Sequence, residues 1–476
     1  MLSLSNTLTK QIEPFRPLRG RSVRMYSCGP TVYAPAHIGN MRAYLFADVL
    51  RRVLLLNGYR VKHVMNITDV GHLTDDADAG EDKLERAAAQ QEKTAAELAD
   101  FYTQAFLRDL TRLNILMPDA LPRATEYITE MIALVERLEQ RGYTYTTADG
   151  VYFDTSKFDA YGQAFGLEKA LAGDQAGARV AVGEKRSPHD FALWKLTAPG
   201  IKRQQEWESP WGRGFPGWHI ECSVMSRALL GQPFDIHTGG IDHVAVHHTN
   251  EIAQSVAAYG KPLAAFWLHS AFLTVNGGRM GKSEGNLITV DELIAHGIEP
   301  LALRVLVLGA HYRSPLNFTM EALTGAQHSL DHLRAICRDL PKPPARVNAQ
   351  LNAKVRKWSD AFLTAVNDDL DTPHALALTW EVAKSGRDKT ATSACLAYAD
   401  AVLGLGLSEV IGKQLVVPEE VMALVTARET ARIEKDWARA DRLRSQMEAL
   451  GYTLEDTKNG PKVRAVEKGN TMPTSR

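Results

Sequence analysis

Residues 23–66 read VRMYSCGPTVYAPAHIGNMRAYLFADVLRRVLLLNGYRVKHVMN: an apolar run, a turn rich in Gly and Pro, a helical pattern and a second apolar run. Val23–Ser27 and Arg60–Asn66 have the length of strands, and Met41–Asn57 has the periodicity of a helix. A strand, a helix and a strand in this order form a βαβ unit with parallel strands. We therefore predict an α/β fold with a Rossmann-like parallel sheet.

The rest of the sequence contains further elements of this α/β fold, an insertion within it and a helical region after it. Asp82–Asn114 reads as helix, whereas residues 145–205 are rich in Gly, Ala and polar residues. Strand-like runs return at Phe234–His237 and Phe266–His269. Helical patterns dominate after the stiff, Pro-rich linker Leu340–Pro344. We predict a parallel sheet split by an insertion and followed by α-helical carboxy-terminal domains.

Composition and charge exclude several classes of protein. The chain has 476 residues, 45% of them hydrophobic, which predicts about three globular domains. No apolar run reaches the roughly 18 residues of a membrane span, and the first residues lack a secretory signal, so we expect a cytoplasmic protein. A net charge of −1 argues against indiscriminate nucleic-acid binding. Cys337 and Cys395 lie in apolar helical patterns, and we interpret both as buried thiols of a reducing compartment.

Two Gly-containing segments are suited to phosphate groups. In Pro35-Ala36-His37-Ile38-Gly39-Asn40, a turn opens a helix whose N–H groups and partial positive charge attract an anion. His37 can donate to a phosphate oxygen, and Gly39 permits a close approach of the ligand. The second segment, Gly277–Asn286, combines four glycines with Arg279 and Lys282 and predicts a mobile loop for a triphosphate. A solvated surface turn is the alternative for this loop.

Cys28, Cys222, His247 and Glu251 form a candidate Zn²⁺ ligand set. His247 and Glu251 are four residues apart in a helical pattern, which places them on one helix face. The four residues are too scattered to match a local zinc-finger spacing. Buried structural cysteines are the alternative interpretation.

The two phosphate segments together resemble the HIGH and KMSKS signatures of class I aminoacyl-tRNA synthetases. Further blocks narrow the resemblance to the cysteinyl-tRNA synthetase family, and they follow the family's order from about residue 3 to about residue 465. These blocks are Cys28–Tyr33, Asn66–Asp69, Asp190–Lys195, Ser209–Gly212, Gly217–Ser223, Asp235–Gly240 and His311–Asn317.

This resemblance implies ATP-dependent attachment of L-cysteine to tRNA(Cys) through a cysteinyl-adenylate. Zn²⁺, one per chain, is expected to recognise the cysteine thiol, and Mg²⁺ to accompany ATP. The protein is expected to act as a monomer without a membrane. The resemblance assigns catalysis to His37, Asn40, Arg279 and Lys282, further ATP contacts to Gly39 and Asp242, and substrate contacts to Thr68, Trp218 and His237.

Some positions depart from the family pattern. Asn40 stands where the first signature has its second histidine, and Arg279 and Gly281 replace the first lysine and the first serine of the second. Asn keeps an N–H donor, and Arg keeps the charge with a different donor geometry. Pro461–Arg464 lacks the aromatic residue that the family has there, which puts one stacking contact with an anticodon base in doubt.

The segment after Pro418 predicts one final helix and then a short Gly/Asp-rich segment. Its basic residues would form one continuous stripe: Arg428, Arg432, Lys435, Arg439 and Arg442. Such a stripe can follow a phosphate backbone, and a solvated face neutralised by nearby Glu and Asp is the alternative. Within the family, this carboxy-terminal position favours contact with the anticodon end of tRNA.

The predicted parts are bounded as follows. Residues 1–144 and 206–275 are the halves of the nucleotide-binding domain, and 145–205 is the connective insertion. The later parts are the stem-contact region with the Gly-rich loop (276–340), a helical bundle (345–410), a small anticodon-end domain (418–466) and a disordered tail (467–476). Removal of residues from about 345 onward is expected to spare cysteine activation. An amino-sugar ligase of the mycothiol type and a non-catalytic tRNA-binding paralogue remain the alternative functions.

Overall fold

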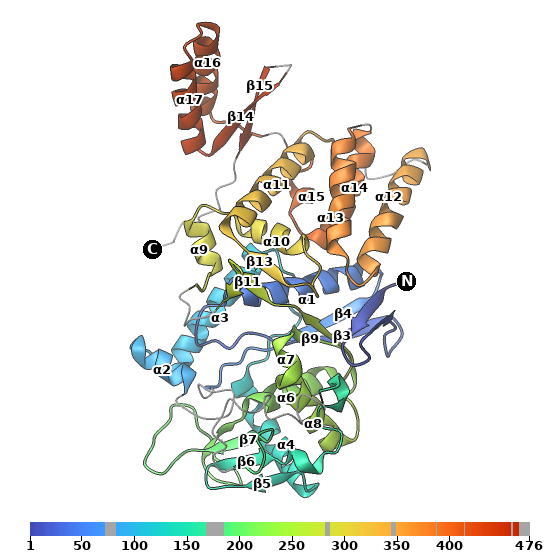
Figure 1. Ribbon diagram of the computed structural model, residues 1–476, viewed down its shortest axis with the longest axis vertical. Coiled ribbons are helices and arrows are strands. Elements are labelled where there is room, and N and C mark those ends of the chain that lie inside the picture. Colours follow the sequence, from blue (N-terminus) through green and yellow to red (C-terminus); the bar gives the residue numbers. More distant parts are fainter. Residues whose placement is uncertain are drawn as a thin grey trace.

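A computed structural model describes residues 1–71, 82–167, 185–280, 286–343, 349–386, 388–413, 415–457 and 460–465. Figure 1 shows an elongated molecule, with the sheets toward one end, a helical layer above them and a small α/β module at the other end. The chain begins with the hairpin of β1 (Ser3–Asn6) and β2 (Gln11–Pro14). Among the described residues, no helix combines the length and apolar character that a membrane crossing requires.

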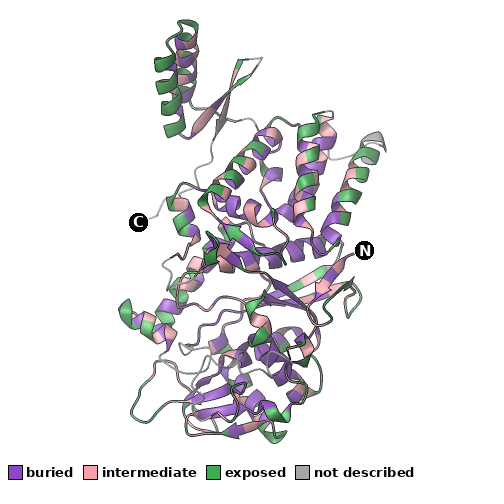
Figure 2. Ribbon diagram, in the orientation of Figure 1, coloured by how far each residue is buried: buried purple, intermediate pink, exposed green. Residues whose placement is uncertain are grey.

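Four parallel strands form the central sheet in the order β10-β9-β3-β4. They are β3 (Ser22–Ser27), β4 (Arg60–Met65), β9 (Phe234–Gly240) and β10 (Ala264–Ser270). Helix α1 (Ile38–Leu56) connects β3 to β4 and is buried along most of its length (Figure 2). The predicted βαβ unit and parallel sheet are confirmed. Strand order reverses between β3 and β9, the switch point beside which such sheets bind ligands.

Two helices follow β4, where one was predicted. Asp82–Asn114 contains α2 (Lys83–Gln90) and α3 (Ala95–Arg112). Glu92 lies between them in a left-handed conformation, with φ at 54°. Thr94 and Glu97 then form a capping box that begins α3. The prediction of a single helix is wrong because this local pair of hydrogen bonds starts a new one.

A second, antiparallel sheet interrupts the parallel one. After α4 (Ile128–Gln140), its strands pair in the order β5-β6-β7-β8, and α6 (Trp218–Leu230) returns the chain to β9. The strands are β5 (Thr144–Thr146), β6 (Gly150–Phe153), β7 (Phe191–Leu196) and β8 (Gly214–Pro216). Three 3-10 helices accompany them, η1 (Ala124–Tyr127), η2 (Thr155–Lys157) and η3 (Gln163–Phe165).

Short elements surround the end of the central sheet. Helices α7 (Asp242–Ala245) and α8 (His247–Tyr259) lie between β9 and β10. After β10, a three-stranded sheet forms in the order β12-β11-β13. Its strands are β11 (Leu273–Val275), β12 (Gly278–Arg279) and β13 (Leu316–Phe318), with α9 (Val290–Ala295) and α10 (Pro300–Leu308) between the last two.

The carboxy-terminal half is helical, as predicted. Its helices are α11 (Met320–Arg338), α12 (Ala349–Asn367), α13 (Thr372–Ser385), α14 (Lys389–Leu403) and α15 (Leu407–Val410). One hydrophobic core joins these helices to the sheet, because Phe362 and Leu396 belong to the same buried cluster as Leu4 and Leu50. The Pro-rich linker at residues 340–344 therefore does not separate two cores.

The terminal module consists of a helical hairpin and a β-hairpin. Helices α16 (Glu419–Ile433) and α17 (Trp437–Ala449) precede β14 (Tyr452–Thr457) and β15 (Gly460–Ala465). The predicted single helix and continuous stripe are wrong, because Lys435 adopts a left-handed φ of 61° and turns the chain. The predicted tail, residues 467–476, lies outside the described residues.

Candidate active site and metal centre

The candidate site lies at the carboxyl ends of the parallel strands. Cys28 directly follows β3, and its backbone N–H donates to the carbonyl of Thr238 in β9 at 3.2 Å. Cys28 therefore stands at the switch point, where the loops after neighbouring strands diverge and leave a crevice.

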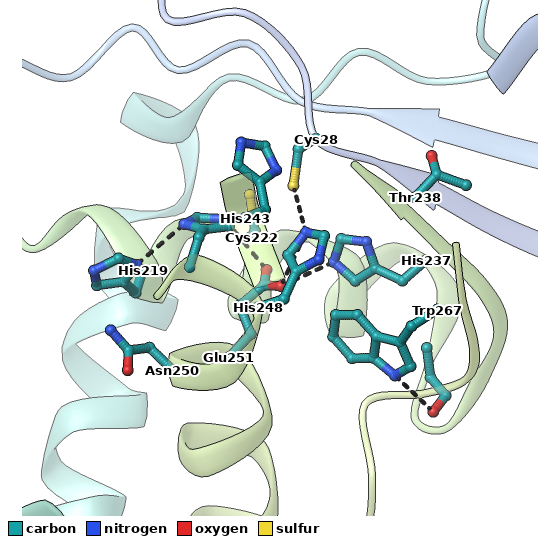
Figure 3. Close-up of polar contacts among 12 residues, drawn as sticks. Cys28, His219, Cys222, His237, Thr238, His243, His248, Asn250, Glu251 and Trp267 are labelled. Carbon is teal, nitrogen blue, oxygen red and sulfur yellow. Dashed lines mark hydrogen bonds and ion pairs between the residues drawn. The ribbon is translucent and has the colours of Figure 1, made fainter. Parts of the chain in front are cut away.

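Four predicted ligand residues meet beside Cys28. Ligand atoms of Cys28, Cys222, His247 and Glu251 all lie within 4.8 Å of one another. Cys222 comes from α6, and His247 and Glu251 come from successive turns of α8. Figure 3 shows Cys28, Cys222 and Glu251 converging from the loop after β3 and from these two helices. The structure thus brings together residues that are far apart in the sequence.

The electrostatics of this cluster favour a cation. Glu251 is fully buried, and neither of its oxygens accepts a hydrogen bond within the described part of the chain. Burial, Cys222 and Glu251 raise the pKa of the Cys28 thiol well above its usual range. A hydrogen bond with Cys28 lowers the pKa of Cys222, but burial and Glu251 outweigh it and raise the pKa. Without a cation the thiols stay protonated, and a metal would displace their protons.

Several histidines that the sequence analysis did not assign surround the cluster. Cys28, His237 and His248 form a second, overlapping group with ligand atoms within 4.8 Å. His248 Nε2 is 3.3 Å from Cys28 Sγ, and its Nδ1 is 2.7 Å from His269 Nε2. His219 Nδ1 lies 3.1 Å from His247 Nδ1. A local signal existed: six of the fifteen histidines fall within residues 219–269.

His237 and Trp218 flank the ligand cluster. His237 is fully buried in β9, stacks on Trp267 at 4.5 Å between ring centroids, and places Nε2 3.0 Å from Glu251 Oε2. The Trp218 ring lies 4.8 Å from that of His247. Both predicted substrate residues therefore lie next to predicted metal ligands.

Thr68 and Asp242 lie on two different sides of the crevice. Thr68 follows β4, is buried and donates to Glu221 Oε2 at 2.9 Å. Asn66 Nδ2 donates to the Thr68 hydroxyl at 2.9 Å, which fixes this side chain. Asp242 begins α7, and its side chain is 59% exposed, so it can reach a ligand in the crevice.

The first phosphate segment forms the amino terminus of α1. His37 is the N-cap: its Nδ1 accepts from the backbone N–H of Asn40 at 3.3 Å. In return Asn40 Oδ1 accepts from the backbone N–H of His37 at 3.1 Å, which completes a capping box. The departure from the family pattern at residue 40 therefore has a structural role. A proton on a neutral His37 ring is left to Nε2, because Nδ1 is the acceptor.

The second phosphate segment approaches the first from both of its sides. A Cβ on Gly39 would lie 2.6 Å from the end of the Met280 side chain, so the two segments are in close contact at this glycine. On the other side, the N–H of Ile38 donates to the carbonyl of Ile288 at 2.8 Å. Gly281 and Lys282 lie outside the described residues, as does the side chain of Arg279. The segments that flank Lys282 are thus anchored at the helix terminus predicted to bind phosphate.

Comparison with known proteins identifies two family domains in this chain. A family model described as the tRNA synthetases class I (C) catalytic domain matches residues 14–328. A second, the cysteinyl-tRNA ligase anticodon binding domain, matches residues 416–464. Among solved structures, Mycobacterium tuberculosis methionyl-tRNA synthetase in complex with methionyl-adenylate is similar in fold, with a TM-score of 0.52. Its sequence identity is 17%, and the match covers 82% of this chain and 92% of that one.

Curated relatives match nearly the whole chain. Cysteine–tRNA ligase 1 of Burkholderia lata is 50% identical over 473 residues, which cover 99% of this chain and 98% of that protein. The cysteine–tRNA ligase of Novosphingobium aromaticivorans is 45% identical and covers 96% of this chain and 95% of its own. The resemblance noted in the sequence is confirmed, and the chain belongs to the cysteine–tRNA ligase family of class I tRNA synthetases.

Proposed function

We propose that this protein attaches L-cysteine to tRNA(Cys) in two steps. The cysteine carboxylate attacks the α-phosphorus of ATP, forms cysteinyl-adenylate and releases pyrophosphate. A ribose hydroxyl of the terminal adenosine of tRNA then attacks the carbonyl carbon, and AMP leaves. The observation that carries this proposal is the meeting of two phosphate segments and a thiol-rich ligand set at one switch point.

Catalysis in this proposal consists of positioning and charge stabilisation. His37 Nε2 and the Asn40 amide contact phosphate oxygens, and the backbone N–H groups at the start of α1 add to them. Arg279 and Lys282 close over the triphosphate, which arrives with Mg²⁺. Gly39 and Asp242 contact ATP, whereas Thr68, Trp218 and His237 shape the pocket for cysteine.

We assign Cys28, Cys222, His247 and Glu251 to one Zn²⁺. The fit rests on the donor set and on the buried Glu251 carboxylate, which lacks a hydrogen-bonded partner among the described residues. When bound, Zn²⁺ supplies a soft Lewis acid that prefers a thiolate to a hydroxyl group. Recognition that depends on such a bond can separate near-isosteres by about 10⁴ or more, whereas packing gives about a hundredfold. A closed, purely structural site is the alternative.

We also propose a compartment and an oligomeric state for this protein. All four cysteines are free in the structure, and free thiols are typical of a reducing compartment, so we propose the cytoplasm. One chain supplies every residue of the candidate site, so we propose a monomer. We place the anticodon contacts in the module from α16 to β15.

Two assays test the proposed function. Cysteine-dependent exchange of pyrophosphate into ATP measures adenylate formation, and charging of tRNA(Cys) measures transfer. We expect both activities, with serine at least about 10⁴-fold poorer than cysteine. Exchange without tRNA charging, but with transfer to an amino-sugar, would indicate the alternative ligase. Binding of tRNA without exchange would indicate a non-catalytic protein.

A further inference from the structure

A buried aspartate in the helical bundle accepts hydrogen bonds from segments near α1, the helix whose amino terminus holds the first phosphate segment. Asp369 lies in the turn between α12 and α13 and is 2% exposed. Its Oδ1 accepts from the Ser5 backbone N–H and from the Tyr312 hydroxyl, each at 2.7 Å. Its Oδ2 accepts from Arg313 Nε at 2.6 Å, and its backbone carbonyl is 2.9 Å from His311 Nε2. These hydrogen bonds connect the turn between α12 and α13 to β1 and to the segment between α10 and β13.

The segment between α10 and β13 also accepts hydrogen bonds from a buried arginine of α1. Arg42 is 2% exposed and donates to the backbone carbonyls of Phe272 and Ser314, with a weaker bond to His311 at 3.4 Å. No carboxylate within the described ranges pairs with Arg42. Burial lowers its pKa to about 10, so it stays charged at neutral pH. Three carbonyl groups therefore fix the orientation of this cation.

The junction between α1 and the bundle is not locked by packing alone. Tyr312 stacks on Phe46 of α1, with ring centroids 4.5 Å apart and 12° between the ring planes. Beside this pair lies a small cavity of about 20 Å³, lined by Phe46, Tyr312, Leu308 and Leu370 among others. A void of this size, about that of one water molecule, leaves the surrounding side chains closely packed. Close packing and the directional hydrogen bonds of Asp369 and Arg42 therefore act together to set the relative position of the two parts.

The backbone of the turn is itself held in a disfavoured conformation. Asp369 and Leu370 both have positive φ angles, 49° and 58°. Side chains other than glycine avoid this region, and such residues persist where surrounding contacts fix them. The hydrogen bonds of Asp369 are the contacts that fix this turn.

We propose that Asp369 is a positioning residue for adenylate formation. Through Tyr312 and Arg313 it sets the segment that holds Arg42, and Arg42 in turn holds the carbonyl of Phe272. Phe272 directly precedes β11, and the β11–β12 hairpin leads to Met280 beside Gly39. The bundle thereby orients the hairpin that enters the loop containing Lys282. This inference rests on the proposed function.

The test compares Asp369→Asn, Arg42→Lys and the double variant in cysteine-dependent pyrophosphate exchange. We expect Asp369→Asn to lower kcat about 10- to 100-fold, the loss typical of a displacement of about 1 Å. The KM for cysteine should stay within about twofold, since the thiol site is untouched. Arg42→Lys should lower kcat to a similar extent. Because both residues act through the same segment, the kcat of the double variant should be no lower than that of the slower single variant. Unchanged kcat, or effects that multiply, would overturn the proposal.

Matched variants separate positioning from general stability. Asp400→Asn alters another buried bundle carboxylate, which accepts from the backbone N–H groups of Leu405 and Ser408. Asp400→Asn should lower the thermal midpoint of unfolding about as much as Asp369→Asn does, and it should leave kcat unchanged. A loss of kcat equal to that of Asp369→Asn would contradict the proposal. If Asp369→Asn does not fold, Arg313→Met removes one contact at a side chain that is 44% exposed. Absence of exchange in the unaltered protein would instead contradict the proposed function.

Discussion

At the scale of single residues, the surroundings of Glu251 indicate that the site binds a cation. Its nearest basic atom is His237 Nε2 at 3.0 Å, and no hydrogen bond reaches either carboxylate oxygen among the described residues. A buried carboxylate without such bonds is costly, and proteins compensate for it with a proton or a cation. Two thiols and an imidazole share the space, so a cation that prefers sulfur and nitrogen is the compensation that fits.

Metal content provides a prediction for two buried cysteines. Cys222→Ser should lose its bound zinc on dialysis against a chelator concentration that leaves the unaltered protein loaded, because a hydroxyl is a poor zinc ligand. Cys337→Ser, at a fully buried thiol in α11, should keep one zinc per chain. Elemental analysis of both variants decides the point, and equal zinc content would remove Cys222 from the ligand set.

His63 predicts a pH dependence of stability. It is 1% exposed in β4, its Nε2 is 2.9 Å from Ser27 Oγ, and burial and then Arg51 lower its pKa to about 3. A histidine in the unfolded chain binds its proton near pH 6.5, whereas buried His63 stays neutral until about pH 3. The stability that neutral His63 contributes to the folded state is therefore fully present above pH 6.5 and is lost as pH falls toward 3. When the pH is lowered from 7 to 5, the free energy of unfolding of the unaltered protein should fall by about 2 kcal/mol more than that of the His63→Gln variant. Urea unfolding at both pH values measures this, and identical losses would contradict it.

At the scale of elements, the start of α1 combines a helix cap with a predicted phosphate site. The capping box uses the Oδ1 atom of Asn40 and leaves the amide nitrogen as a donor. Asn40→Asp should keep the cap and the thermal midpoint, because a carboxylate also accepts from the His37 N–H. It should lower pyrophosphate exchange about tenfold or more, since a donor is replaced by a negative charge near phosphates.

Asn40→Ala is the matched control for that prediction. It should lose about 0.5–1.5 kcal/mol of stability with the bond from the His37 N–H to Asn40 Oδ1, whereas the bond from the Asn40 N–H to His37 Nδ1 remains. An Asn40→Asp variant with full exchange activity would show that Asn40 serves only the helix.

The hairpin of α16 and α17 divides the basic residues into two groups. Arg428 is 4% exposed and, with Arg432, donates to Asp456, which lowers the pKa of that carboxyl to about 2. The Arg439 side chain is 48% exposed, and among the described residues it has only a distant ion pair, to Glu434 at 3.6 Å. The first group holds the module together, and the second is available to a phosphate backbone.

This division predicts different effects of two arginine substitutions. Arg439→Glu should weaken tRNA(Cys) binding and reduce the slope of log affinity against log salt by about 1. Arg428→Gln should instead lower the thermal midpoint of the module. Affinity measured from 50 to 200 mM salt tests the first effect. An unchanged salt slope for Arg439→Glu would assign that residue to a merely solvated face.

At the scale of the whole molecule, the chain has fewer independent parts than its linkers suggest. The core that contains Leu50 and Val305 also contains Phe362 and Leu396, so the bundle and the sheet are buried against each other. The terminal module has a small core of its own, formed by Val421, Val425, Met447 and Leu454.

Truncation tests this division and revises the expectation from the sequence. A chain that ends at residue 413 should retain cysteine-dependent exchange and lose most tRNA charging, because it lacks only the terminal module. A chain that ends at residue 344 should lose exchange, because α1 would expose the core it shares with α12 and α14. Soluble expression, thermal midpoint and exchange are the measurements. Full exchange in the shorter chain would mean that the shared core is dispensable.

Local patterns in the sequence determined the chemistry of this protein. The strand, turn and helix of residues 23–66 predicted the parallel sheet, and the phosphate segments with the Cys, His and Glu residues predicted the family and its substrates. The turn, the helix face of His247 and Glu251, and the phosphate segments are local signals, because each depends on a few neighbouring residues. The break before α3 also has a local signal, the capping box of Thr94 and Glu97, so the sequence contains the information for two helices.

Only the tertiary structure decided how distant residues meet. Strand order places the loop after β3 beside β9 and gathers Cys28, His237 and His248, and nothing in their spacing specifies that contact. The shared core and the bonds of Asp369 likewise join residues several hundred positions apart, Ser5 with Asp369 among them. Such contacts depend on which buried surfaces pack together, and that choice is made by the whole chain rather than by any segment of it.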